Sequence, residues 1–502
     1  MSLFVLLAVA LVLYSVCLTI YRLLFHPLAR FPGPRLAAAT WCYEFYFEVV
    51  LHGQFYKEIE RLHSIYGPIV RINPTEVHVK DPNWYDELYA AGGRKRDKSD
   101  WYNARTGGES VFSTVGHDHH RVRRTALNQY FSKASIVKLE DLIQDKVDRL
   151  ADAFRASMAK GESIETHTAF IAMTLDVISH YAFGKPFGLL DIPGFSPEWK
   201  HDLLGAVESG IVVRYLPWII DILVKMPLWL AVWMNPAVAH FAKFQKDIEN
   251  QVNATLGAID EPKASIHRTI FQELRDSDLP PQEKSVTRLI DEGIILIGAG
   301  GDTTAHTLAA LTFYVLNNPP VLKKLTDELY TAIPDPTHLP KWQKLEQLPY
   351  LRATILETHR IQAIITARLI RVAPNDTLQF KQWTIPAGTP VSMSTHFTHR
   401  DPSLFPEPMR FDPDRWFGAA KGMEKYVVPF SKGTRGCIGM NLASAQIYLA
   451  TATLFRRFEL ELHDTTDRDV EIVWDGFAGG LRKDSKGINV KVKSVEGSKL
   501  ET

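Results

Sequence analysis

The sequence predicts a mostly helical α+β protein, with one large helical domain that carries small β-sheets and follows an N-terminal transmembrane helix. Residues 3–20 form an uncharged apolar run, and residues 132–341 have a mainly helical pattern. Strand-like segments punctuated by turn residues lie before and after that helical region. Long helices with small sheets placed early and late in the chain indicate a single α+β domain.

The apolar run from Leu3 to Ile20 is long enough to cross a membrane. As a helix it rises about 27 Å, close to the roughly 30 Å of a hydrocarbon core. A cleaved signal peptide is the alternative, but such peptides begin with a positive segment. Here the positive residues Arg22, His26 and Arg30 follow the run. We therefore expect an uncleaved single-pass anchor at residues 1–24, with the body of the protein in the cytosol.

The rest of the chain divides into a hinge, one domain and a tail. Residues 25–36 contain Phe31-Pro-Gly-Pro34, a stiff sequence that does not favour a helix. The main domain is expected at 37–492, and the polar tail at 493–502 is expected to fray. Short strands are expected at 69–72, at 76–79 and within 369–390.

Composition excludes several classes of protein. Lys+Arg and Asp+Glu both number 57, so the net charge is zero, which argues against nucleic-acid binding. The three cysteines, Cys17, Cys42 and Cys437, form no CxxC pair. A zinc ribbon, an iron–sulfur cluster and a disulfide framework are therefore not expected.

One apolar segment, Leu216 to Phe241, carries Trp218, Trp229 and Trp233. Three prolines interrupt it, so it is not expected to span a bilayer. Two interpretations remain equally open. The segment is either buried core, or an apolar face that dips into the membrane surface, where tryptophan is favoured.

The segment Phe430-Ser-Lys-Gly433-Thr-Arg435-Gly-Cys437-Ile-Gly439 precedes a helical pattern that continues to about residue 458. A helix N-terminus lowers the pKa of a thiol and stabilises the thiolate. The glycines allow a tight turn and a close approach to a flat ligand, while the fixed charge of Arg435 suits a carboxylate. A lone cysteine is usually a buried structural residue. Its spacing with glycine and arginine here favours a ligand-binding role.

This segment resembles the haem-ligand signature of the cytochrome P450 family, F-x-x-G-x-R-x-C-x-G, at every fixed position. The resemblance implies that haem b is the cofactor, bound by a segment that includes Gly433 and Gly439. Cys437 is then the axial metal ligand, Arg435 contacts a propionate and Phe430 packs beside the sulfur. A thiolate ligand promotes cleavage of the O–O bond.

A second motif, Ala299-Gly-Gly-Asp302-Thr303-Thr304, lies in a helix expected at 287–317. Two mid-helix glycines cost about 1 kcal/mol each relative to alanine, so they are not simple filler. The motif resembles the family's oxygen-binding stretch, A-G-x-D/E-T-T/S. The resemblance implies that Thr303 hydrogen-bonds dioxygen and that Asp302 helps to relay protons.

A third motif, Glu357-Thr-His-Arg360, places an acid and a base on one helix face. Together with Arg415 it resembles the family's Glu-Arg-Arg triad, which implies a structural role for the three residues. Arg368, which follows this motif, is expected to make a further propionate contact by resemblance. The proline that usually precedes that arginine is missing here.

A looser match is His120-Arg-Val-Arg-Arg124. It resembles the family's W-R-x-x-R helix, whose first and last residues reach a propionate, with histidine in place of tryptophan. His117, Asp118, His119 and His120 suggest a metal site as an alternative, but their spacing matches no common ligand pattern.

The resemblance covers essentially the whole chain, and 26–34 and 66–74 look most like fungal microsomal members that tailor terpenoids, polyketides or alkaloids. It implies an endoplasmic reticulum membrane protein with a cytosolic catalytic domain. The chain has no nucleotide-binding glycine motif and no flavin domain after the cysteine motif. We therefore expect electrons from NADPH–cytochrome P450 reductase. Lys432, Arg123 and Arg121 are candidates for a basic docking face, or simply belong to a solvated surface.

The expected reaction is insertion of one oxygen atom from O2 into a small hydrophobic substrate. The same fold could instead perform oxidative ring closure, desaturation or isomerisation, although the Asp302–Thr303 pair disfavours an isomerase. A haem sensor or electron carrier is the alternative from another class. By resemblance, the substrate pocket is expected to be lined by 110–116, 211–218, 294–301, 363–366 and Phe477.

Overall fold

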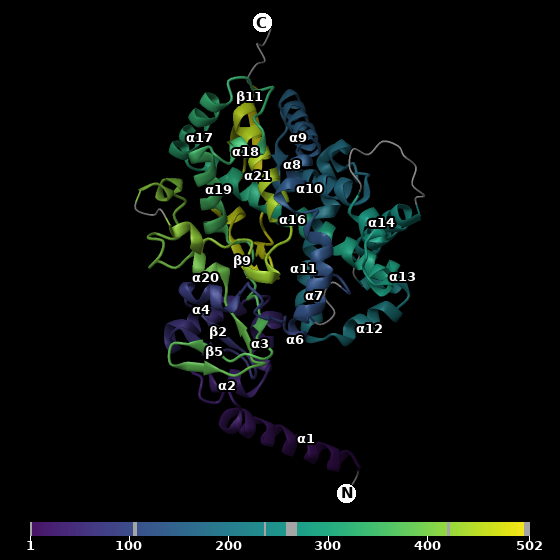
Figure 1. The fold of residues 1–502 in the computed structure, drawn as a ribbon, viewed down its shortest axis with the longest axis vertical. Coiled ribbons are helices and arrows are strands. Elements are labelled where there is room, and N and C mark those ends of the chain that lie inside the picture. The colour runs from purple at the N-terminus through teal and green to yellow at the C-terminus, as the bar shows by residue number, and fades with distance from the viewer. Residues whose placement is uncertain (1–2, 104–107, 235–236, 258–268, 419–421, 496–502) are drawn as a thin grey trace.

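The structure is a computed structural model that describes residues 3–103, 108–234, 237–257, 269–418 and 422–495. Long helices form the larger part of the body, and the early sheet lies at the end from which the N-terminal helix projects (Figure 1). The chain is thus mostly helical with small sheets, as predicted.

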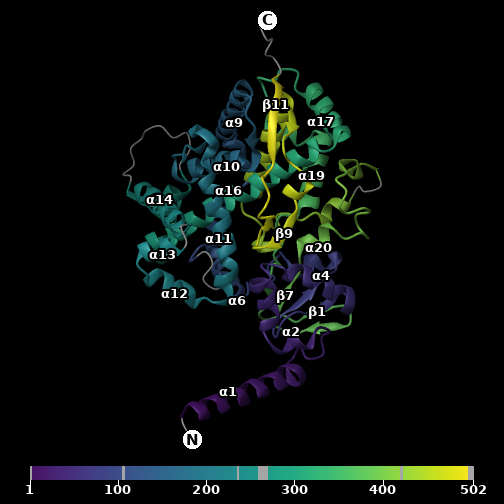
Figure 2. The same ribbon diagram turned by 180° about the vertical axis from the view of Figure 1, so that it is seen from behind.

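The N-terminal helix α1 (Leu3–Ile20) continues as a π-helical turn over Tyr21–Phe25 and has no buried residue. It extends away from the body in both views (Figures 1 and 2). By length and composition it is a candidate membrane span. A second apolar helix passes the same test, α16 (Val286–Leu316), but most of it is buried inside the body. It is therefore a core helix.

The proline–glycine segment after the anchor is held against the body. Pro32 O accepts a hydrogen bond of 2.7 Å from Arg71 N. A Cβ atom on Gly33 would lie 2.4 Å from Arg71 O, so only glycine fits this close approach. The Arg71 guanidinium donates to Arg22 O at 2.9 Å. These contacts fix the direction in which the chain leaves the anchor.

The early sheet combines strands from both ends of the chain. Its order is β1-β2-β7-β4, with β2 and β7 parallel and the other neighbours antiparallel. A two-stranded hairpin, β5–β6, lies beside it in sequence. The predicted strand regions are confirmed by β1 Ile69–Arg71, β2 Val77–Val79, β4 Arg371–Val372, β5 Leu378–Phe380 and β6 Trp383–Ile385. The last strand of this region, β7 Pro390–Ser392, extends past the predicted limit at 390.

The helical core is built around α16, which confirms the helix predicted at 287–317. It packs against α10, of which nearly every residue is buried, and against α14, α19 and α21. Burial of these apolar faces is the main source of stability in such a core. Helices of the body besides α16 include α7 His117–Asn128, α9 Glu140–Lys160, α10 Thr166–Phe183, α11 Pro197–Tyr215, α14 Ala237–Gly257, α17 Pro319–Ala332, α19 Pro349–Gln362 and α21 Met440–Arg457.

Two late sheets complete the body. One has the order β3-β11-β8, and the other is the antiparallel hairpin β10-β9. Strand β11 pairs with β8 as far as Val495, so ordered structure extends beyond the predicted boundary at 492. The rest of the predicted tail, 496–502, lies outside the described residues. The strands are β3 Ile164–Glu165, β8 Phe458–Leu462, β9 Ile472–Asp475, β10 Gly479–Leu481 and β11 Asn489–Val495.

The tryptophan-rich segment forms two short helices, α12 (Trp218–Lys225) and α13 (Leu228–Met234). The side chains of Trp218, Trp229 and Trp233 are 54%, 72% and 79% exposed. Of the two interpretations, buried core is therefore wrong for these three residues. Helix α12 lies toward the end of the body from which α1 projects (Figures 1 and 2).

Candidate functional site

The cysteine segment forms a tight loop directly before α21. Cys437 N donates to Phe430 O at 2.8 Å, and Gly436 N donates to Gly433 O at 3.1 Å. Gly433 has φ +73°, and a Cβ atom there would lie 2.4 Å from Ala90 O. A side chain at this position would therefore force the loop away from its support.

The Cys437 side chain is accessible to solvent even though it lies deep in the protein. Burial raises the pKa of its thiol, although the Gly439 N–H hydrogen bond and the positive charge of Arg124 oppose this shift. The backbone at the start of α21 thus lowers the pKa as expected, but desolvation of the free thiol outweighs it. The sulfur can thus be reached by solvent although protein atoms surround most of it.

Several cations gather beside this loop. Arg124 donates to Gly436 O at 2.8 Å. Arg435 donates to the carbonyl groups of Thr114 and Val115, and its Nε has no partner among the described residues. Burial, the main cause, and the charge of Arg371 lower the pKa of Arg435 to about 9, partly opposed by Asp97.

Lys98, Arg371 and His120 complete this group. Burial and the charges of Arg371 and Arg435 hold the pKa of Lys98 well below its ordinary value. Burial lowers the pKa of Arg371, which stacks over the Tyr89 ring at 5.2 Å. Burial and then the charge of Arg435 lower the pKa of His120 to about 2, so its ring is neutral. Sequence reasoning missed Lys98 and Arg371, which no motif distinguished.

We call Lys98, Arg124, Arg371 and Arg435 the cation cluster. Burial lowers the pKa values of all four, and repulsion from neighbouring arginines lowers those of Lys98 and Arg435 further, which is unfavourable in the absence of an anion. Two carboxylates placed among these donors would relieve this repulsion and accept charge-assisted hydrogen bonds. The donor set therefore fits a flat cofactor that carries two carboxylates and whose metal binds a sulfur ligand.

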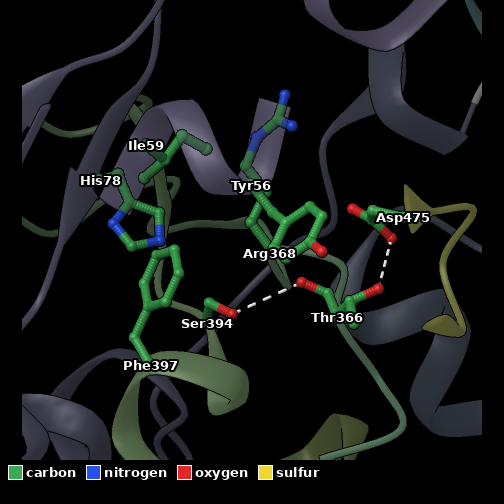
Figure 3. A pocket seen from close by; sticks show the side chains of 8 residues that line it. All are labelled: Tyr56, Ile59, His78, Thr366, Arg368, Ser394, Phe397 and Asp475. Carbon is green, nitrogen blue, oxygen red and sulfur yellow. Dashed lines mark hydrogen bonds between the residues drawn. The ribbon is translucent and has the colours of Figure 1, made fainter. Parts of the chain in front are cut away.

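Arg368 does not belong to the cation cluster. Its guanidinium is bound by three buried carboxylates: Nε lies 2.9 Å from Glu76, Nη1 lies 3.5 Å from Glu48, and Nη2 pairs with Glu44. In Figure 3 it lines a small cavity of about 10 Å³, the space of about one water. Because carboxylates already surround it, a further carboxylate would be repelled. The expectation of a propionate contact for Arg368 is thus corrected.

The predicted Glu-Arg-Arg triad is confirmed. Arg360 binds both carboxylate oxygens of Glu357, at 2.9 and 2.8 Å, and both side chains are fully buried. Arg415 Nε donates to Glu357 at 2.9 Å. Arg360 also donates to the carbonyls of His399 and Pro408, which ties α19 to the loops that precede the cysteine segment.

On α16, Asp302 and Thr303 have different partners. Asp302 accepts a hydrogen bond of 2.9 Å from His167 Nε2, from the first turn of α10. Burial would raise the pKa of Asp302, but the hydrogen bond and charge of His167 outweigh it and the pKa is lowered. Thr303 Oγ1 donates to Ala299 O at 3.0 Å. Ala299 is exposed although α16 is largely buried, so this turn borders an open space.

Two of the segments expected to line the pocket meet. The rings of Phe112 and Phe477 lie 5.5 Å apart at 88°.

The basic docking face expected for a redox partner is predicted less well. Arg123 is buried and forms an ion pair of 2.6 Å with Glu283, so it is not a surface residue. Lys432 remains at the surface, paired with Asp86 at 2.7 Å. The alternative metal site at 117–120 is not supported, since no group of metal-ligating side chains is found among the described residues.

Comparison with known proteins identifies the class to which this fold and site belong. Residues 34–490 match the family model of cytochrome P450. The chain therefore belongs to the cytochrome P450 family, whose members bind haem through a thiolate and act as oxidoreductases.

Its relatives include fungal monooxygenases of secondary metabolism. The chain is 42% identical over 487 residues to tryptophan 6-hydroxylase fscE of Fusarium equiseti, covering 96% of this chain and 95% of that protein. It is 41% identical to conidiogenone synthase PchP450 of Penicillium rubens, covering 95% and 96%. It is 38% identical to the cytochrome P450 monooxygenase TRI4 of Fusarium sporotrichioides, covering 93% and 90%. The protein is a P450 monooxygenase that uses O2, a substrate and a redox partner.

Proposed function

We propose that the protein binds haem b through Cys437 and inserts one oxygen atom from O2 into a small hydrophobic molecule of fungal secondary metabolism. The cation cluster beside the cysteine loop carries this proposal, because it supplies donors for two propionates next to an accessible sulfur. Arg435, Arg124 and Arg371 bind the carboxylates, and neutral His120 accepts or donates a hydrogen bond beside them. When bound, haem with a thiolate ligand supplies the activation of O2.

The α16 residues hold and pass protons. Thr303 Oγ1 lies on the turn that borders the open space, where its hydroxyl both donates and accepts hydrogen bonds. Asp302 is ionised at neutral pH, because His167 keeps its pKa low, and its carboxylate can therefore accept hydrogen bonds on the proton path. No hydrogen bond joins the two side chains among the described residues.

Electrons come from NADPH through a separate NADPH–cytochrome P450 reductase on the endoplasmic reticulum membrane. Family membership supports the need for a redox partner. Helix α1 holds the chain on the membrane, with the body in the cytosol because the positive residues follow the helix.

The exposed tryptophans support a second contact with membrane lipid. Trp229 and Trp233 are the most exposed large aromatic side chains of α12–α13 and suit the interfacial region. In vesicles that contain brominated lipid, tryptophan fluorescence of the full chain should be quenched. The double variant Trp229→Phe, Trp233→Phe should lose most of this quenching, whereas Trp342→Phe, at a buried position, should not. Equal quenching in all three proteins would contradict the lipid contact.

The haem assignment is tested by Cys437→Ala. In the parent, the reduced carbon monoxide complex should absorb at about 450 nm, as thiolate ligation implies. The variant should lose this band, while Cys42→Ala, an exposed cysteine elsewhere, should keep it. NADPH consumption that rises with added substrate then separates an enzyme from an electron carrier. A normal spectrum in Cys437→Ala would refute the assignment.

A further inference from the structure

The tip of the β9–β10 hairpin has an unusual backbone at Phe477. This residue has φ +111°, although it is neither glycine nor asparagine. A bulky side chain in this region is a genuine outlier, and such strain persists only where the surroundings fix the conformation. The contacts that fix Phe477 therefore indicate what its side chain is needed for.

Backbone hydrogen bonds attach the hairpin tip to residues 364–367. Gly479 N donates to Ile364 O at 2.7 Å, and Ala367 N donates to Phe477 O at 3.2 Å. Between them, Ile365 and Ala478 form an isolated antiparallel bridge. The tip is thus paired with this segment from Phe477 to Gly479.

Asp475 is the side chain that holds the turn. It is 5% exposed, and its Oδ1 accepts two hydrogen bonds, from Phe477 N at 2.9 Å and from Thr366 Oγ1 at 2.7 Å. Figure 3 shows Thr366 between Asp475 and Ser394, whose hydroxyl donates to Thr366 O at 3.4 Å. One carboxylate oxygen therefore joins the hairpin tip to the neighbouring segment.

The strained turn aims the Phe477 ring at Phe112. The two rings are nearly perpendicular, with centroids 5.5 Å apart, and both side chains are only half-buried although most residues around Phe477 are buried. Lys98 lies 3.7 Å above the Phe112 ring and belongs to the cation cluster. The aromatic pair therefore borders the proposed haem site.

We propose that Phe477 determines specificity, that Asp475 is its positioning residue, and that the Phe112–Phe477 pair selects substrates with a planar aromatic ring. Aromatic rings attract a further ring in offset or edge-to-face geometry beyond simple burial of apolar area. A saturated ring of similar size lacks this attraction and is thicker. Because Lys98 occupies one face of Phe112, the Phe477 ring supplies the free aromatic surface. This inference deepens the proposed function and rests on it.

The test compares two probes with the same heterocycle and different ring planarity, 4-phenylimidazole and 4-cyclohexylimidazole. Binding to the ferric holoenzyme is followed by the spectral shift and, independently, by isothermal titration calorimetry. The parent should prefer the phenyl compound by about threefold or more, the range that aromatic contacts contribute. Phe477→Leu should bring the ratio of the two dissociation constants close to one.

Asp475 offers a matched pair of variants. Asp475→Asn and Asp475→Ala both remove the charge, but only asparagine keeps an oxygen that accepts from Phe477 N and Thr366 Oγ1. The phenyl preference should survive in Asp475→Asn and disappear in Asp475→Ala. If Asp475→Ala does not incorporate haem, Phe477→Leu still tests whether the Phe477 ring produces the phenyl preference.

An unchanged phenyl preference in Phe477→Leu would overturn the role of Phe477. Loss of the preference in both Asp475 variants would overturn the positioning role. Failure of the proposed function has a different signature, because a chain without a thiolate haem spectrum fails before any probe is added. In that case neither probe gives a spectral shift, whereas a haem-loaded Phe477→Leu variant with an unchanged phenyl preference overturns this inference alone, so the two failures are distinguishable.

Discussion

Arg368 is surrounded by Glu44, Glu48 and Glu76, which we call the acid cluster. Glu48 allows a quantitative test of the charge state of this cluster. It lies in the π-helical turn Tyr46–Val50, is 1% exposed, and neither carboxylate oxygen has a hydrogen-bond partner among the described residues. Burial and the negative charge of Asp475 raise its pKa from an ordinary 4.5 to about 8, although Arg214 and Arg368 oppose the shift. At neutral pH we therefore expect a neutral Glu48 in the folded protein.

The size of the effect follows from proton linkage. Between about pH 4.5 and pH 8 the unfolded chain ionises Glu48 while the folded protein keeps it protonated, so the folded state binds more protons. Stability must then fall as pH rises, by about 1.4 kcal/mol for each pH unit in this window. Summed from the lower limit to pH 7, the loss is about 3 kcal/mol. Glu48→Gln cannot ionise and escapes this loss.

The measurement is the difference in Tm between Glu48→Gln and the parent at pH 5, 6, 7 and 8, at one scan rate. A chain of this size has an unfolding entropy near 1 kcal/mol per degree, so the difference should grow by about 3 °C between pH 5 and pH 7. The substitution also changes Tm by an amount that does not depend on pH, because an amide replaces the carboxyl group. The change in the Tm difference from one pH to the next is free of this constant amount. Glu60→Gln, at an exposed position, should show no such trend. A difference that stays constant with pH would refute a neutral Glu48.

Two other predictions concern catalysis and topology. Thr303→Ala should bind haem and substrate normally but yield severalfold less product per NADPH, with peroxide released instead, because a positioned proton transfer is worth about 100-fold or more. Thr307→Ala, one turn further along α16, should stay coupled, and equal coupling in both variants would contradict the role of Thr303. The sequons at Asn253 and Asn375 should remain unglycosylated in a eukaryotic host if the body is cytosolic. Asn375 is the better reporter because it lies in an exposed turn rather than in a helix, and a glycan there would reverse the topology.

Much of the fold could be predicted because it depends on local patterns. The strands at 69–72 and 76–79 are bounded by turn residues, and α16 has a continuous apolar pattern. The tryptophan helices could not be resolved from sequence, because an apolar helix has the same pattern whether it is buried or faces lipid. Their exposure depends on which neighbours cover them, and that is set by tertiary packing.

The predicted site is more complete for the cysteine loop than for the residues around it. Phe430, Gly433 and Arg435 lie close in sequence to Cys437, so one motif places them together. Lys98 comes from a distant loop, and no local signal marks it. The helix-terminus contribution to the pKa of Cys437 could be predicted from local sequence, whereas the opposing effect of burial depends on long-range packing and could not.

The choice between Arg368 and Arg371 shows where sequence reasoning stops. The two arginines are three residues apart, and the chain turns between them, because Ile370 N donates to Arg368 O at 3.1 Å. Arg371 begins β4 and lies opposite Val391 of β7, whereas Arg368 lies before that strand. Arg371 then joins the cation cluster, which needs anions. Arg368 joins the acid cluster, where protonation of Glu48 relieves the excess negative charge.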